Sequence, residues 1–123
     1  MSLKAVHYIN QFYAGIGGET MADTGFGILE EKKGPALGLE QLWNGEMTIS
    51  KVVYCGDNYV NTDENYGEVK EKLAKVIREE KPDVFIAGPA FNAGRYGVAC
   101  AKVCDYVRSE LGVPSVTCMW HEN

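Results

Sequence analysis

Four short stretches along the chain have the pattern of β-strands. They lie at residues 4–9, 50–55, 83–87 and 115–119. The third stretch is rich in β-branched and aromatic residues and follows Lys81-Pro82, which is typical of a parallel strand buried on both faces. We expect this strand to stop at Gly88-Pro89.

Two longer stretches with apolar residues at helical spacing predict helices at Asp63–Glu80 and Arg95–Leu111. Thr62 is the candidate N-cap of the first helix, and Gly112 to Pro114 provide a stop signal after the second. One apolar stripe marks the buried face of the first helix and consists of Tyr66, Val69, Leu73, Val76 and Ile77.

The order of these elements predicts the fold class. Strands that alternate with helices of this length imply right-handed crossovers and a parallel sheet. With 123 residues, of which 46% are hydrophobic, the chain has the usual size of one domain. We therefore predict a single α/β domain over residues 1–123: a three-layer lobe with a mainly parallel sheet, flavodoxin-like or Rossmann-like. About forty residues separate the first two strands, and residues 37–44 among them are predicted to form a short helix.

The charge balance excludes two classes of partner. The net charge is −5, and 12 basic residues are scattered among 17 acidic ones, which argues against binding to nucleic acid or to an anionic membrane. The first residues enter a strand pattern without an apolar signal core, and no stretch reaches the ~18 apolar residues of a membrane span. We expect a cytoplasmic protein.

The junction between the third strand and the second long helix is the first candidate site. Ligands of open α/β sheets bind at the carboxyl ends of the strands, where this junction lies. Its glycines let backbone N–H groups approach a ligand, the helix N-terminus is partly positive, and Arg95 can pair with a carboxylate or phosphate. We predict substrate or anion binding by Asn92, Gly94, Arg95 and Tyr96. Alternatively, the glycines only permit a tight turn and Tyr96 only fills the core.

Two further segments are expected at the same edge of the sheet. Asp57 and Asn58 follow the second strand directly, so the sheet positions them toward the same crevice. Gly17 and Gly18 resemble part of a phosphate-binding turn, although the spacing lacks the last glycine of a dinucleotide fingerprint. Glu19, which follows them, is a weak candidate for accepting a proton, with a solvated loop charge as the alternative.

The four cysteines suggest packing more than chemistry. Cys100 and Cys104 share one face of the predicted helix, but the chain has only two histidines and no paired cysteine motif, so no metal site is predicted. Cys55 ends a strand near a helix N-terminus, which makes it a weak catalytic candidate. A small buried hydrophobe is the alternative for Cys55, and a buried core histidine is expected for His7.

Several of these segments together resemble a known family. The motifs, in chain order, are VHYINQF at residues 6–12, AGIGGE at 14–19, AD at 22–23, CGDNY at 55–59 and GPAFNAGRYGVAC at 88–100. They are similar to the amino-terminal part of the substrate-specific selenoprotein subunit of component B in glycine, sarcosine and betaine reductases. The resemblance covers nearly the whole chain.

This resemblance implies a function and two kinds of partner. The family splits the C–N bond of a small glycine-type substrate reductively, in a complex with other subunits, on the way to acetyl phosphate. Its redox centre is a selenocysteine followed by cysteines, whereas this sequence has neither a selenocysteine nor a C-x-x-C motif, so no cofactor is expected within the chain. We therefore expect a lobe or shortened relative that binds substrate or partner subunits and does not turn over alone. A non-catalytic docking module and a small anion-binding protein are the alternatives, and homo-oligomerisation stays open.

Overall fold

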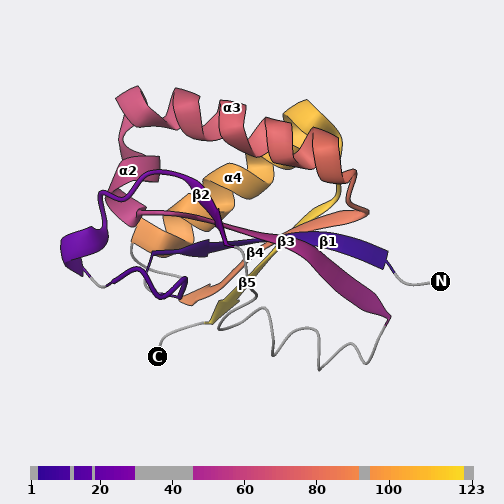
Figure 1. The fold of residues 1–123 in the computed structure, drawn as a ribbon, viewed down its shortest axis with the longest axis horizontal. Helices are drawn as coiled ribbons and strands as arrows, with labels where there is room; N and C mark the ends of the chain where they lie inside the picture. Colours follow the sequence, from indigo (N-terminus) through magenta and orange to yellow (C-terminus); the bar gives the residue numbers. More distant parts are fainter. Residues whose placement is uncertain (1–2, 12, 18, 30–45, 92–94, 121–123) are drawn as a thin grey trace.

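A five-stranded sheet with helices packed against it forms the centre of the molecule (Figure 1). The computed structural model describes residues 3–11, 13–17, 19–29, 46–91 and 95–120. In chain order its elements are β1 (Leu3–Asn10), the 3₁₀ turn η1 (Glu19–Met21), β2 (Gly27–Leu29), β3 (Met47–Cys55), α2 (Asp57–Asn61), α3 (Asp63–Glu80), β4 (Val84–Phe91), α4 (Arg95–Leu111) and β5 (Ser115–Trp120).

The sheet is mostly parallel, as predicted. Its strand order is β2-β3-β1-β4-β5, so β1 lies in the middle and pairs in parallel with β3 on one side and β4 on the other. β4 and β5 are also parallel, and only the short edge strand β2 runs antiparallel to its neighbour β3. The α/β class is confirmed, while β2 was not predicted, because three residues carry too weak a pattern to be recognised.

Helices α2, α3 and α4 cover one face of the sheet (Figure 1). Their apolar stripes pack on β1, β3 and β4 in one core cluster, in which Val69 and Leu73 of α3 and Val103 of α4 are fully buried. A second cluster, with Ala5 and Ile9 of β1, lies on the opposite face. Within the described residues no α-helix covers that face, and residues 37–44 lie outside them, so the third layer stays a prediction.

The predicted end of the third strand is wrong. β4 continues through Gly88 and Pro89 to Phe91, and its pairing with β5 shifts register between Ala87 and Ala90. Gly88 has a φ of 106°, a region that favours glycine, so it permits the irregularity. The strand continues past it because β5 offers a partner on the far side of the shift.

Both long helices have the predicted bounds, but the cap of α3 differs. Thr62 occupies the N-cap position with an extended backbone, yet its side chain caps no N–H group of α3. Its hydroxyl instead donates a hydrogen bond of 2.7 Å to the carbonyl of Asn58 in the short helix α2. The sequence did not predict α2, and this helix changes the role of Thr62 from an N-cap to a link between two helices.

Candidate functional site

The carboxyl ends of β1 and β3 meet in a hydrogen-bonded polar cluster, which we call the carboxyl-edge cluster: Asn10, Gln11 and Asp57. The Asn10 amide donates to Asp57 Oδ2 at 3.1 Å, and the backbone N–H of Asp57 donates to Gln11 Oε1 at 3.2 Å. All three residues are buried, with at most 7% of each exposed. The parallel register, in which Asn10 lies opposite Cys55, brings these residues together although they are far apart in the sequence.

Aromatic residues flank this cluster. The rings of Tyr13 and Tyr96 lie with their centroids 5.7 Å apart and tilted by 40°. Tyr13 is held to the cluster because its backbone N–H donates to Asn10 Oδ1 at 3.0 Å. Tyr96 comes from the first turn of α4, and burial raises its pKa well above the usual range, with smaller contributions from Cys100, Tyr13 and Asp57. The predicted site residues Asp57 and Tyr96 are therefore brought close together.

Tyr8 lies beneath the cluster in the core. It is fully buried, and within the described part of the chain its hydroxyl has no hydrogen-bond partner. Burial raises the pKa of Tyr8 first, and the neighbouring Cys55, Cys100, Asp57 and Tyr96 raise it further. A buried hydroxyl without a partner is costly in a protein interior, so this position is suited to a bound water or a polar ligand group.

The thiols around Tyr8 are not activated. Burial raises the pKa of Cys55 to about 12 and that of Cys100 to about 12. The Cys55 thiol donates a long hydrogen bond of 3.8 Å to the carbonyl of Thr24. Since the thiolate is the nucleophile, and a thiol of this pKa is protonated at neutral pH, the geometry does not support Cys55 as a catalytic residue. It supports the alternative, a small buried hydrophobe.

The N-terminus of α2 is filled by the chain itself. The carbonyl of Ala22 accepts hydrogen bonds from the backbone N–H groups of Asn58 at 2.8 Å and Tyr59 at 3.2 Å. Gly56 makes this approach possible, because a Cβ atom there would lie 2.3 Å from the Ala22 oxygen. The backbone N–H of Asn58 is thus not available to an anion, and the predicted binding role of Asn58 rests on its side chain alone.

The first glycine loop also turns its N–H groups toward its own chain. Ile16 and Gly17 donate to the carbonyl of Gln11 at 3.0 and 3.3 Å. The N–H group of Gly17 is therefore used by the fold, which does not support a phosphate-binding turn. Gly18 lies outside the described residues. Glu19 begins η1, and its side chain lies outside the described part of the structure.

The second glycine loop is described only at its ends. Asn92 and Gly94 lie outside the described residues, as does the side chain of Arg95, whose backbone begins α4. The predicted anion site around Arg95 therefore stays a prediction. The sequence points to the segment from Asn10 to Glu19 as part of the pocket, but it singles out neither Asn10, Gln11 nor Tyr13 within that segment, although Asn10 and Gln11 are polar residues at the end of a buried strand, the same signal that pointed to Asp57.

Other chemistry is limited in the described residues. His7 is fully buried in β1, where its Nε2 atom forms a hydrogen bond with the Gly88 carbonyl. Burial lowers the pKa of His7 below its usual value. Among the residues that the structure describes, no three histidine, cysteine or acidic side chains gather as a metal site would require. Within the same residues, no helix has both the length and the apolar character that a membrane crossing needs.

Comparisons with known proteins identify relatives for nearly the whole chain. The sequence profile described as glycine/sarcosine/betaine reductase selenoprotein B matches residues 2–123. The chain is 45% identical over 121 residues to the sarcosine reductase complex component B subunit beta of Peptoclostridium acidaminophilum, and 46% identical over 121 residues to the glycine reductase complex component B subunit gamma of the same organism. It is 38% identical over 120 residues to that organism's betaine reductase complex component B subunit beta.

These matches cover 98% of this chain but only 27% of each of the three relatives. The chain therefore spans about a quarter of the length of the curated relatives that it matches. No solved structure matches it. The flavodoxin-like or Rossmann-like description consequently stays a prediction, whereas the α/β class rests on the strands and helices described above.

Proposed function

Because the chain belongs to the glycine/sarcosine/betaine reductase selenoprotein B family, we propose that it acts in a reductase complex of this kind and contributes substrate or partner binding. The binding residues are those of the carboxyl-edge cluster with Tyr96. The observation that carries this proposal is the buried carboxylate of Asp57, which accepts a hydrogen bond from Asn10 while Gln11 accepts one from the Asp57 backbone N–H, at the carboxyl ends of two neighbouring parallel strands. We place the complex in the cytoplasm.

The reaction proposed for the complex is reductive cleavage of the C–N bond of a glycine-type substrate. Glycine, orthophosphate and the two electrons of a dithiol then give acetyl phosphate, ammonia and water. In the longer family members a selenocysteine supplies the reactive group, and this sequence contains none. Burial raises the pKa of the Cys55 and Cys100 thiols to about 12, which does not favour them as nucleophiles, and the role proposed for this chain is binding and orientation.

The cluster has features that suit a small zwitterionic substrate. Glycine, sarcosine and betaine each carry a positively charged nitrogen and a carboxylate. Asp57 adds a negative charge at the carboxyl edge, and the rings of Tyr13 and Tyr96 add aromatic surface, which attracts a cationic nitrogen. The predicted role of Arg95, pairing with a carboxylate or phosphate, would supply the opposite charge.

Calorimetric titration of the chain with glycine, sarcosine and betaine tests the proposal. We expect one of the three to bind, and Asp57→Asn to weaken this binding at least tenfold. Asp63→Asn is the matched control, because Asp63 is an exposed carboxylate in the first turn of α3. Thermal melting of both variants separates a binding defect from loss of fold.

Two outcomes would contradict the proposal. Substrate binding by this chain is wrong if the wild-type chain binds none of the three compounds, or if both variants weaken binding equally. Turnover of glycine, sarcosine or betaine by the chain alone, with only a dithiol as reductant, would contradict the assignment of a binding role.

A further inference from the structure

Two buried tyrosine hydroxyl groups beside the carboxyl-edge cluster, those of Tyr8 and Tyr96, have no hydrogen-bond partner among the described residues. Tyr8 is fully buried in the middle strand β1, and Tyr96 lies in the first turn of α4. The thiol of Cys100 is near the Tyr96 hydroxyl, but a thiol is only a weak hydrogen-bonding group. Each hydroxyl group gives up its hydrogen bonds to water when the chain folds, so each lowers the stability of the fold unless something else binds it.

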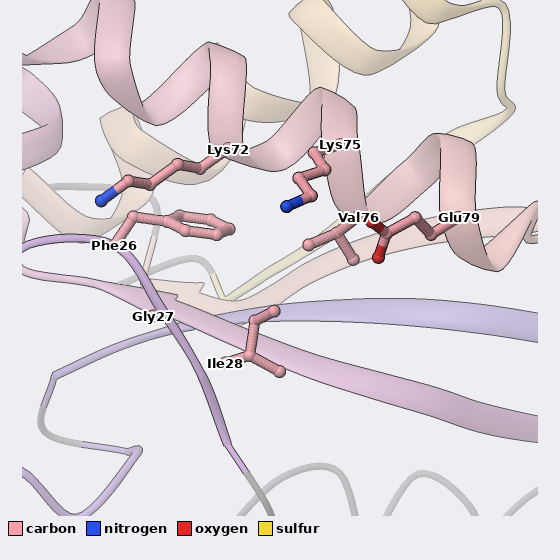
Figure 2. A pocket seen from close by; sticks show the side chains of 7 residues that line it. All are labelled: Phe26, Gly27, Ile28, Lys72, Lys75, Val76 and Glu79. Carbon is pink, nitrogen blue, oxygen red and sulfur yellow. The ribbon is translucent and has the colours of Figure 1, made fainter.

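The groove between the β2 segment and α3 has no such feature (Figure 2). Its volume is about 330 Å³, and Phe26 forms part of its apolar floor. Lys72 pairs with Glu68 at 2.7 Å, which leaves one lysine, Lys75, and one glutamate, Glu79, on the rim. No residue that lines this groove carries a buried polar side-chain atom without a partner. The carboxyl edge, and not this groove, therefore shows unmet hydrogen bonds that a ligand can satisfy.

Both hydroxyl groups lie close to Asp57. Tyr8 comes two residues before Asn10 on β1, so both side chains point to the face of the sheet that the helices cover, where Asn10 donates to Asp57. Tyr96 packs against the same core cluster as Tyr8, and its ring lies beside Tyr13. Burial is the main cause of the raised pKa values of Tyr8 and Tyr96, and Asp57 raises both further, as expected of a carboxylate near each ring.

The surroundings of these hydroxyl groups favour a cation that carries N–H groups. The side chains that raise the pKa values of Tyr8 and Tyr96 are thiols, phenols and the carboxylate of Asp57, and none of them is cationic. A phenol oxygen accepts a hydrogen bond, and a carboxylate attracts positive charge. A protonated primary amine satisfies both, because it carries a positive charge and several N–H donors. A quaternary nitrogen carries the charge but no N–H group, so it would leave both hydroxyl groups unpaired.

The limited room at this position favours the same kind of ligand. Tyr8 is fully buried, and Asn10 and Asp57 are only 7% and 6% exposed. A ligand group that reaches the Tyr8 hydroxyl must therefore be small. The ammonium group of glycine is smaller than the trimethylammonium group of betaine, and the methylated nitrogen of sarcosine lies between them.

We propose that the hydroxyl groups of Tyr8 and Tyr96 accept hydrogen bonds from the ammonium group of the substrate and make the site selective for glycine over betaine. Sarcosine, whose nitrogen carries fewer N–H groups than that of glycine, binds with intermediate affinity. Tyr8 is thereby a specificity-determining residue, and Asp57 supplies the charge that attracts the nitrogen. This inference rests on the proposed function, to which it adds the orientation of the substrate and the order of preference.

The test is calorimetric titration of the chain with glycine, sarcosine and betaine, for the wild type and for Tyr8→Phe and Tyr96→Phe. Both substitutions remove the hydroxyl group and keep the ring. Tyr106→Phe is the matched control, because Tyr106 lines a separate hollow between α3 and α4. Thermal melting of each chain without ligand gives a second measurement that does not depend on binding.

We expect the wild type to bind glycine most tightly and betaine at least about tenfold more weakly, because a site built to hydrogen-bond N–H groups rejects an analogue that lacks them. Tyr8→Phe should weaken glycine binding about tenfold, as expected for the loss of a hydrogen bond to a charged group, and should leave betaine binding unchanged. Tyr96→Phe should act in the same direction, and Tyr106→Phe should have no effect on binding. Without ligand, Tyr8→Phe should melt at a higher temperature than the wild type, because it removes a buried hydroxyl group that has no partner.

Four results would overturn the inference. Betaine that binds the wild type as tightly as glycine does, or a Tyr8→Phe variant that weakens all three compounds equally, would exclude selection through N–H groups. A Tyr8→Phe variant that binds glycine as the wild type does would show that the hydroxyl group holds at most a water molecule. A lower melting temperature of Tyr8→Phe would show that the hydroxyl group has a partner within the fold. These outcomes differ from failure of the proposed function, in which the wild type binds none of the three compounds and this inference fails with it.

Discussion

Substituting Gly56 by alanine tests how the chain closes over the end of β3. A Cβ atom at this position would lie 2.3 Å from the carbonyl oxygen of Ala22 and 2.7 Å from the backbone nitrogen of Thr24. Both neighbours are backbone atoms, so they cannot rotate away as a side chain can. The backbone of Gly56 itself, with φ −66° and ψ 139°, is allowed for alanine, and the cost must therefore come from pushing residues 22–24 off the strand end.

The magnitude follows from the hydrogen bonds that cross this contact. Gly56 donates to the Thr24 carbonyl at 2.8 Å, and Asn58 and Tyr59 donate to the Ala22 carbonyl. Each such bond contributes about 0.5–1.5 kcal/mol, and disrupting all of them costs about 2–4 kcal/mol. Alanine recovers about 0.4–1 kcal/mol by restricting the unfolded chain. We expect Gly56→Ala to lower the free energy of unfolding by about 1–3.5 kcal/mol.

Urea denaturation followed by circular dichroism measures this loss, with Gly67→Ala as the matched control. Gly67 lies inside α3, and a Cβ atom there would meet nothing within 4 Å. The control should therefore raise the free energy of unfolding by up to about 1 kcal/mol, the difference between alanine and glycine in a helix. If Gly56→Ala unfolds at the same urea concentration as the wild type while the control is stabilised, residues 22–24 do not pack on the strand end as described.

Three further predictions concern the cysteines, His7 and Arg95. Because burial raises the pKa values of Cys55 and Cys100 to about 12, a thiol-specific alkylating agent at pH 8 should label them only after unfolding, and rapid labelling of either in native protein, mapped by mass spectrometry, would contradict their burial. Burial lowers the pKa of His7 in the folded chain, so the unfolded chain binds the proton more readily and the free energy of unfolding should fall as the pH drops below 6.5. In urea titrations between pH 5 and pH 7, His7→Gln should flatten this pH dependence. An unchanged slope in the variant would assign the pH dependence to other groups. Arg95→Lys should weaken the binding of small carboxylates or phosphate, and Arg95→Ala should weaken it further. The loss of a charge-assisted hydrogen bond of about 1.5–3 kcal/mol corresponds to a roughly ten- to hundredfold loss of affinity. Lower melting temperatures in both variants without a separate binding defect would make Arg95 a structural residue.

Local patterns in the sequence were sufficient for the two long helices and for the fold class. The bounds of α3 and α4 follow from apolar residues at helical spacing and from the Gly112 stop signal, because these features act within a few turns of chain. Alternation of strands and long helices then implied parallel pairing. The short elements escaped prediction, since β2 and α2 contain too few residues for a period to be visible.

The tertiary structure decided which polar residues meet. Asn10 and Asp57 come together because the strands that precede them, β1 and β3, are neighbours in the sheet. The spacing of strands along the chain does not specify their order in the sheet. The loop at residues 22–24 packs on the N-terminus of α2, where its hydrogen-bond partners include Gly56 and Asn58. These partners are distant in the sequence, so local patterns do not predict this contact either. The sequence by itself determined the two long helices, the parallel pairing of the main strands and the edge of the sheet at which polar residues gather. Only tertiary packing decided that Cys55 is a protonated core thiol and that Asp57 is held in a hydrogen-bonded cluster, because burial and long-range contacts set both properties.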